Sequence, residues 1–90
     1  MQTKMRVGLL ESLNEAKGDA ERMAELERAI HRAAKRFHER TLKQAHVVHV
    51  HPGTIEGLVP DGQVLKVGGM VVRKRRDVLR QHVWVGVEDE

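Results

Sequence analysis

The chain of 90 residues has no cysteine and only two aromatic side chains, Phe37 and Trp84. Without cysteine it cannot form disulfides, bind zinc through thiolates or use a cysteine nucleophile. A chain of this length buries only about 60–65% of its unfolded surface, and aromatic side chains bury the most area per residue, so its core is thin. These deficits predict that association with other subunits contributes part of the stability.

Long apolar runs are also missing, because no stretch of 18 apolar residues occurs, and this argues against a membrane span. Residues 1–10 contain no apolar segment long enough for a secretory signal, because Glu11 follows Leu10 directly. The expected location is the cytoplasm or an assembled particle. The net charge of +3 suits nucleic acid or another anionic partner, and it equally suits solubility.

Residues 9–45 are predicted to be helical, because proline is absent and Ala, Leu, Glu, Lys and Arg dominate. Apolar side chains recur at steps of four and three, the spacing of a helix that buries one narrow stripe. At Gly18 the helix either continues, at a cost of about 1 kcal/mol, or ends and restarts as a hairpin. The stripe keeps its phase across Gly18, which favours one long helix; it comprises Leu9, Leu13, Ala16, Ala20, Met23, Ile30, Ala34 and Phe37.

Charge reverses along the same segment, with a net of −4 from Glu11 to Glu27 (six acids, two bases) and +5 from Arg28 to Lys43 (six bases, one acid). The helix dipole explains part of this pattern, but only near the helix ends. Two antiparallel copies would set each acidic half against a basic half. The predicted contact residues for such self-association are Leu13, Met23, Ile30 and Phe37. The alternative is that the stripe packs on the chain's own sheet.

Residues 46–87 predict short strands and tight turns, and residues 88–90 an acidic tail. Strands are expected at 47–50, 54–59, 63–67, 70–75 and 82–87, with turns at Pro60-Asp61-Gly62, Gly68-Gly69 and Arg76-Asp77. Four or five antiparallel strands then form either a small barrel or an open meander under the helix. The chain is therefore predicted to be a single α+β domain spanning 1–90.

Histidines gather at His46, His49 and His51, and His82 follows on a later strand. Two of these imidazoles with His82 would suit zinc or nickel, or a pH-sensitive interface. No Asp or Glu lies within four residues of the run to complete a coordination shell. Histidines on a half-exposed strand are the simpler interpretation, so neither a metal nor another cofactor is predicted.

A second cluster, Arg73-Lys74-Arg75-Arg76, suits contacts with phosphates. No aromatic residue is interleaved with these Arg and Lys residues, which argues against a surface on which nucleobases stack. An edge strand protected from aggregation by charge is the simpler interpretation. Helix residues Arg32, Lys35, Arg36 and Arg40 are predicted to extend the same anion-binding surface.

Catalytic motifs are sparse: Ser12 is the only serine, and no nucleophile elbow or glycine-rich phosphate loop occurs. His51 and Glu56 are the one candidate acid–base pair, but a domain this small rarely forms a deep pocket. We therefore predict that the chain is not an enzyme and has no small-molecule substrate. Trp84 is expected to be a core anchor rather than an interface residue.

Together these features predict a non-enzymatic, self-associating structural, assembly or adaptor subunit of a multi-copy complex, such as a virus or phage particle. The alternative is a nucleic-acid-binding module that contacts the phosphate backbone through the basic helix and strand residues. A third hypothesis is a small regulator or inhibitor that docks on another protein. The expected partners are copies of the chain or other protein subunits, with nucleic acid as the alternative and no membrane.

Overall fold

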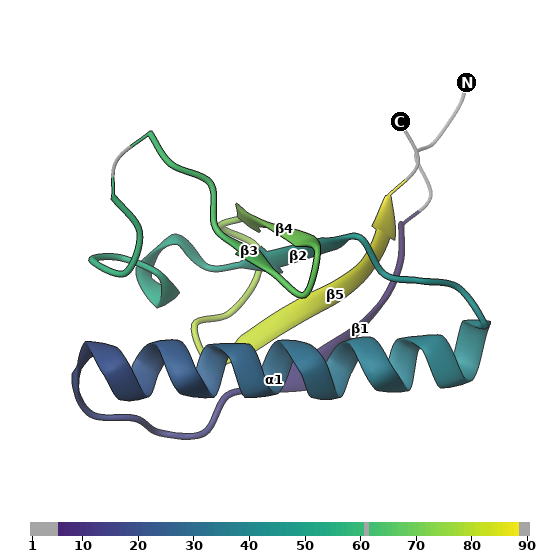
Figure 1. Cartoon of the computed structure of the whole chain (residues 1–90), viewed down its shortest axis with the longest axis horizontal. Coiled ribbons are helices and arrows are strands. Elements are labelled where there is room, and N and C mark those ends of the chain that lie inside the picture. Colours follow the sequence, from purple (N-terminus) through teal and green to yellow (C-terminus); the bar gives the residue numbers. More distant parts are fainter. Residues whose placement is uncertain (1–5, 61, 89–90) are drawn as a thin grey trace.

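The computed structural model describes residues 6–60 and 62–88 (Figure 1). It confirms the α+β class, with one long helix and a five-stranded sheet. Within the described residues, no helix combines the length and the apolar character needed to cross a bilayer. The elements are β1 (Arg6–Ser12), α1 (Gly18–Thr41), β2 (Val47–Val50), a 3-10 turn (Pro52–Thr54), β3 (Lys66–Val67), β4 (Met70–Lys74) and β5 (His82–Glu88).

The sheet is open rather than a closed barrel, and its strand order is β1-β5-β2-β4-β3. β2 and β4 are parallel, and the other neighbours are antiparallel. The helix α1 lies along one face of the sheet (Figure 1). Gly68 and Gly69 join β3 to β4 with φ angles of 56° and 82°, the left-handed backbone that a two-residue hairpin turn needs. The predicted glycine hairpin is thus confirmed.

The predicted helical segment 9–45 is wrong at its N-terminal end. Leu9 lies in β1, and Leu13 and Ala16 lie in the connection that follows it. Helix α1 begins at Gly18, where φ is 77°, and the backbone N–H of Lys17 donates to the Glu21 carboxylate at 2.7 Å. Gly18 therefore marks the start of the helix, neither a tolerated interruption nor a hairpin. β1 is a strand because all seven of its residues pair with β5.

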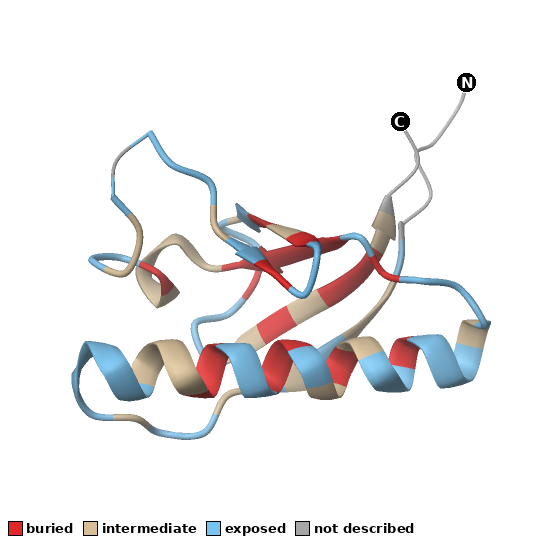
Figure 2. Cartoon of the chain, in the orientation of Figure 1, coloured by how far each residue is buried: buried red, intermediate tan, exposed pale blue. Residues whose placement is uncertain are grey.

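The apolar stripe of α1 packs on the chain's own sheet, as the alternative interpretation predicted. Figure 2 shows the buried helix residues along one side of α1, facing the strands. Ile30 and Phe37 have no exposed surface, so the prediction that they carry self-association is wrong. Leu13 and Met23, the other two predicted contact residues, are partly buried against the same core. The fully buried core includes Leu26, Ile30, Phe37, Val48, Val50, Val83 and Val85.

The β part follows the prediction except between β2 and β4. The strands at 47–50, 70–75 and 82–87 are confirmed within a residue, but the strand expected at 54–59 is replaced by turns, and the one expected at 63–67 is only Lys66–Val67. Arg22 of α1 holds three carbonyls in this region, and Gly57 has a φ of 80°, which prevents a regular strand. Asp61 of the predicted turn and residues 89–90 of the predicted tail lie outside the described residues, and Glu88 ends β5.

Candidate functional site

The face of the sheet opposite α1 is called the open face here. Val83 and Val85 of β5 belong to the core under α1, and side chains alternate along a strand, so His82 and Trp84 point to the open face. Trp84 is half-buried there and contacts the ring of His49, with ring centroids 5.0 Å apart. The prediction that Trp84 anchors the core is wrong, because that core lies on the other side of the sheet.

Gly8 makes room for this indole, and Gly86 lets β1 and β5 approach closely. Gly8 of β1 pairs with Gly86 of β5, and a Cβ on Gly8 would overlap the six-membered ring of Trp84. A Cβ on Gly86 would overlap the carbonyl oxygen of Val7 and stand 2.6 Å from Gly8 Cα. The indole thus lies over Gly8, where β1 and β5 approach closely. Sequence reasoning missed this pair because the two glycines lie near opposite ends of the chain.

Beside Trp84 the open face carries a pocket of about 510 Å³, called the open-face pocket. His49 is 3% exposed in it, whereas Leu10 and Leu79 are 57% and 63% exposed. Arg75 donates two hydrogen bonds of 2.8 Å to Asp77, and this pairing lowers the pKa of Asp77. The pocket therefore combines apolar walls with an ion pair whose two charges offset each other. Its lining residues are Leu10, His49, Arg75, Asp77, Val78, Leu79, His82 and Trp84.

The histidines considered as metal ligands are separated in the structure. His49 and His82 line the open-face pocket, whereas His51 accepts a 2.9 Å hydrogen bond from the backbone N–H of Gly53 and lines another pocket. His46 is exposed, before β2 begins. Across residues 6–60 and 62–88, no three His, Asp or Glu side chains are grouped so that they would hold a metal ion.

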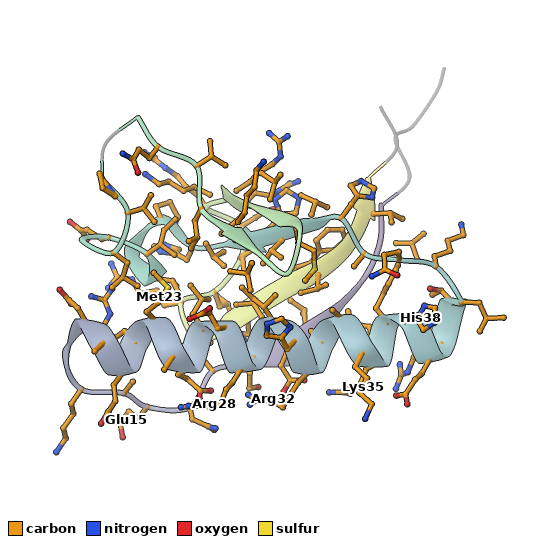
Figure 3. All side chains as sticks on the ribbon, viewed as in Figure 1. Glu15, Met23, Arg28, Arg32, Lys35 and His38 are labelled. Atoms are coloured by element: carbon orange, nitrogen blue, oxygen red, sulfur yellow. The ribbon has the colours of Figure 1, made fainter. Side chains whose placement is uncertain are left out.

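The helix bases serve a structural network. Arg36 Nη1 lies 2.7 Å from the Glu11 carboxylate, and Arg32 lies between Glu11 (3.7 Å) and Glu25 (3.3 Å). Figure 3 shows Arg28, Arg32 and Lys35 leaving α1 on the side away from β3 and β4. Since Glu11 belongs to β1, these ion pairs attach the helix to the first strand.

Glu25 is the buried centre of that network, with 4% of its surface exposed. Its carboxylate accepts the backbone N–H of Asn14 at 2.9 Å and hydrogen bonds from Arg32 and Arg28. These donors, the Asn14 N–H first, lower the pKa of Glu25 although burial opposes the shift. Glu25 and its donors therefore form an ion-pair network, called the Glu25 clasp, that joins α1 to the connection following β1.

The run Arg73 to Arg76 is divided between two surfaces. Arg75 lies at the open face, and alternation along β4 places Arg73 there too, whereas Lys74 and Arg76 line a second pocket of about 710 Å³ with Arg80. Arg32 and Arg36 lie beside β1, at the opposite edge of the sheet from β3 and β4. The single basic surface predicted from the sequence is therefore wrong; Lys35 and Arg40 are exposed on α1.

β1 lies at an edge of the sheet, and no described strand pairs with its outer side. Comparison with known family models, curated proteins and solved structures gave no match. Two surfaces of this fold are the candidate functional sites: the edge strand with the open face, and the pocket lined by Lys74, Arg76 and Arg80.

Proposed function

We propose that the chain is a non-enzymatic, self-associating structural, assembly or adaptor subunit whose copies join through β1 rather than through α1. The supporting observation is the outer edge of β1, a seven-residue strand that carries the exposed side chain of Leu10. Unpaired strand edges are ready templates for pairing with another chain. A site of action in the cytoplasm or within an assembled particle belongs to the same proposal.

The bonding pattern of β1 fixes how a second copy would pair. The N–H of Leu13 donates to the carbonyl of Gln81 at 2.7 Å, at the end of the β1–β5 ladder. Bonding alternates along an antiparallel pair, so Leu9 bonds toward β5 while Gly8 and Leu10 direct their N–H and C=O outward. A second copy has to pair outward residues with outward residues. The symmetric register that uses the whole strand is centred on Leu9.

In this register Leu10 of one copy lies opposite Gly8 of the other. Trp84 lies over Gly8, so each Leu10 side chain would pack beside the indole of the neighbouring copy. The contact occurs twice because a two-fold axis relates the copies. Leu10 is 57% exposed, and this pairing gives it an apolar partner without disturbing the core under α1.

The experiment is size-exclusion chromatography with light scattering at several protein concentrations. We expect the wild-type mass to rise toward that of a dimer, and Leu10→Lys to remain a monomer because a lysine on an edge strand opposes pairing. Val64→Lys is the matched control, since Val64 is 64% exposed and lies in the loop before β3, near the opposite edge. Circular dichroism and thermal unfolding verify that each variant is folded.

A wild-type chain that stays monomeric at every concentration overturns the proposal. Leu79→Lys tests whether the copies instead associate through their open faces, because Leu79 lies on the open face but not in the edge strand β1. If Leu79→Lys dissociates the copies and Leu10→Lys does not, the copies stack through their open faces and the pairing through β1 is refuted.

A further inference from the structure

We infer that the pocket lined by Lys74, Arg76 and Arg80, called the loop pocket, binds a small phosphate-bearing ligand with an apolar body. It has a volume of about 710 Å³ and lies between described residues of the segments 51–60 and 62–65 and the chain that follows β4. This inference is independent of the proposed association through β1, which uses the other edge of the sheet.

Three cations come to this pocket from a short segment of chain. Lys74 is the last residue of β4, Arg76 lies in the turn after it, and Arg80 precedes β5. Glu56 is the one acid among the described lining residues, and no carboxylate in the described part of the chain forms an ion pair with these three cations. A concave wall with this charge attracts anions.

The exposed side chain of Arg80 lies against the loop. A Cβ on Gly53 would stand 3.1 Å from Cζ and Nη2 of Arg80, so the absent side chain lets the guanidinium lie against the loop. The hydroxyl of Thr54 donates to the backbone carbonyl of Arg80 at 3.1 Å. The planar guanidinium of Arg80, next to the loop, offers paired N–H donors that match the geometry of an oxyanion.

The loop wall itself is braced from the helix side. Nη2 of Arg22 donates to the carbonyls of Gly53, Thr54 and Glu56 at 3.5, 3.1 and 3.2 Å. Gly57 has a φ of 80°, which other residues rarely adopt, and open space where a Cβ would stand. These contacts hold the pocket in shape before a ligand arrives, as is usual for small-molecule sites.

The lining also decides between ligand classes. Ile55, Val59, Leu65 and Val72 offer an apolar surface beside the cations, which suits an organic body attached to the anion. Convergent lysine and arginine donors favour phosphate. A nucleic-acid backbone fits less well, since a strand of phosphates needs a continuous row of lysine and arginine side chains.

The test is an NMR titration of the ¹⁵N-labelled chain with phenyl phosphate, and with inorganic phosphate and phenol as its two halves. We expect phenyl phosphate to shift the amide signals of Gly53 and Gly57 and to bind more tightly than either half. Lys74→Gln should weaken binding about tenfold, the usual effect of removing one charged hydrogen-bond donor. Arg73→Gln is the matched control: it removes the same charge from the neighbouring residue on the other face, and should weaken binding by less than about twofold.

Three outcomes overturn the inference. The first is no shift of the loop signals with phenyl phosphate. The second is an equal loss of affinity in Lys74→Gln and Arg73→Gln, which would assign binding to net charge rather than to the pocket. The third is a single-stranded oligonucleotide that shifts these signals when phenyl phosphate does not. Arg76→Gln repeats the test if Lys74→Gln does not fold.

Discussion

On the face of the sheet under α1, Phe37 and Ile30 reach complete burial because a 24-residue helix covers the strands. On the open face Trp84 is half-buried, lying over Gly8 and against His49. The two aromatic residues of the chain are thus divided, one to each face. A small chain can therefore complete one core with a helix and leave its second face partly exposed, with Leu10 and Leu79 available for contact.

The largest expected effect lies on the helix-covered face. Phe37→Ala leaves a cavity under α1 and should destabilise the fold by about 3–5 kcal/mol, the usual cost of this substitution in a core. Urea unfolding followed by circular dichroism measures it. Leu79→Ala on the open face, where the side chain is 63% exposed, should change stability by less than about 0.5 kcal/mol. Equal losses in the two variants would abolish the distinction between the faces.

The next effect tests how closely β1 and β5 approach on the open face. In Gly86→Ala the new methyl group meets the backbone of Val7 and Gly8, which cannot rotate away. We expect a loss of about 1–3 kcal/mol, as for overpacking of a core. In Gly8→Ala the methyl group meets Trp84 as well as the backbone carbonyl oxygen of Val85, so the fluorescence of Trp84 should also move to longer wavelength as the indole is displaced. Unchanged stability in Gly86→Ala would show that the strands separate freely.

The smallest effect concerns the Glu25 clasp at the rim of the helix-covered face. The lowered pKa of Glu25 means that its carboxylate stabilises the fold above its ordinary pKa of 4.5, and that this contribution is lost as pH falls through the lower folded value. Glu25→Gln should therefore cost about 1–2 kcal/mol at pH 7 and progressively less in acid. Urea unfolding at several pH values measures the difference from wild type. Glu27→Gln, at an exposed neighbour on α1, is the matched control at each pH.

Local sequence patterns correctly predicted the elements whose conformation does not depend on pairing with a distant strand. The helix from Gly18 onward follows from helix-forming residues and one apolar face, and the hairpin at Gly68-Gly69 follows from two glycines. Leu9 and Leu13 fit the helical spacing equally well, yet they lie in and after a strand. Spacing alone cannot separate the two states there, because pairing with β5 at the far end of the chain decides between them.

The candidate sites were predicted only in part. Side chains of a strand alternate between faces, and Lys74 and Arg75 accordingly line different pockets. Arg80 was missed, because its place in the loop pocket depends on Gly53, far from it in sequence. Arg32 and Arg36 were assigned to an anion surface because Glu11, their partner, was placed in the same helix rather than in β1.

Local sequence was enough to predict the α+β class, most of the helix after Gly18 and the turns at Gly68-Gly69 and Arg76-Asp77, because these depend on neighbours within a few residues. That the apolar stripe packs inward and that β1 is an edge strand became apparent from the folded chain alone. The same holds for the division of the basic residues between separate surfaces. Each of these outcomes depends on which distant strands pair, and pairing is settled by the burial and the hydrogen bonds of the whole sheet.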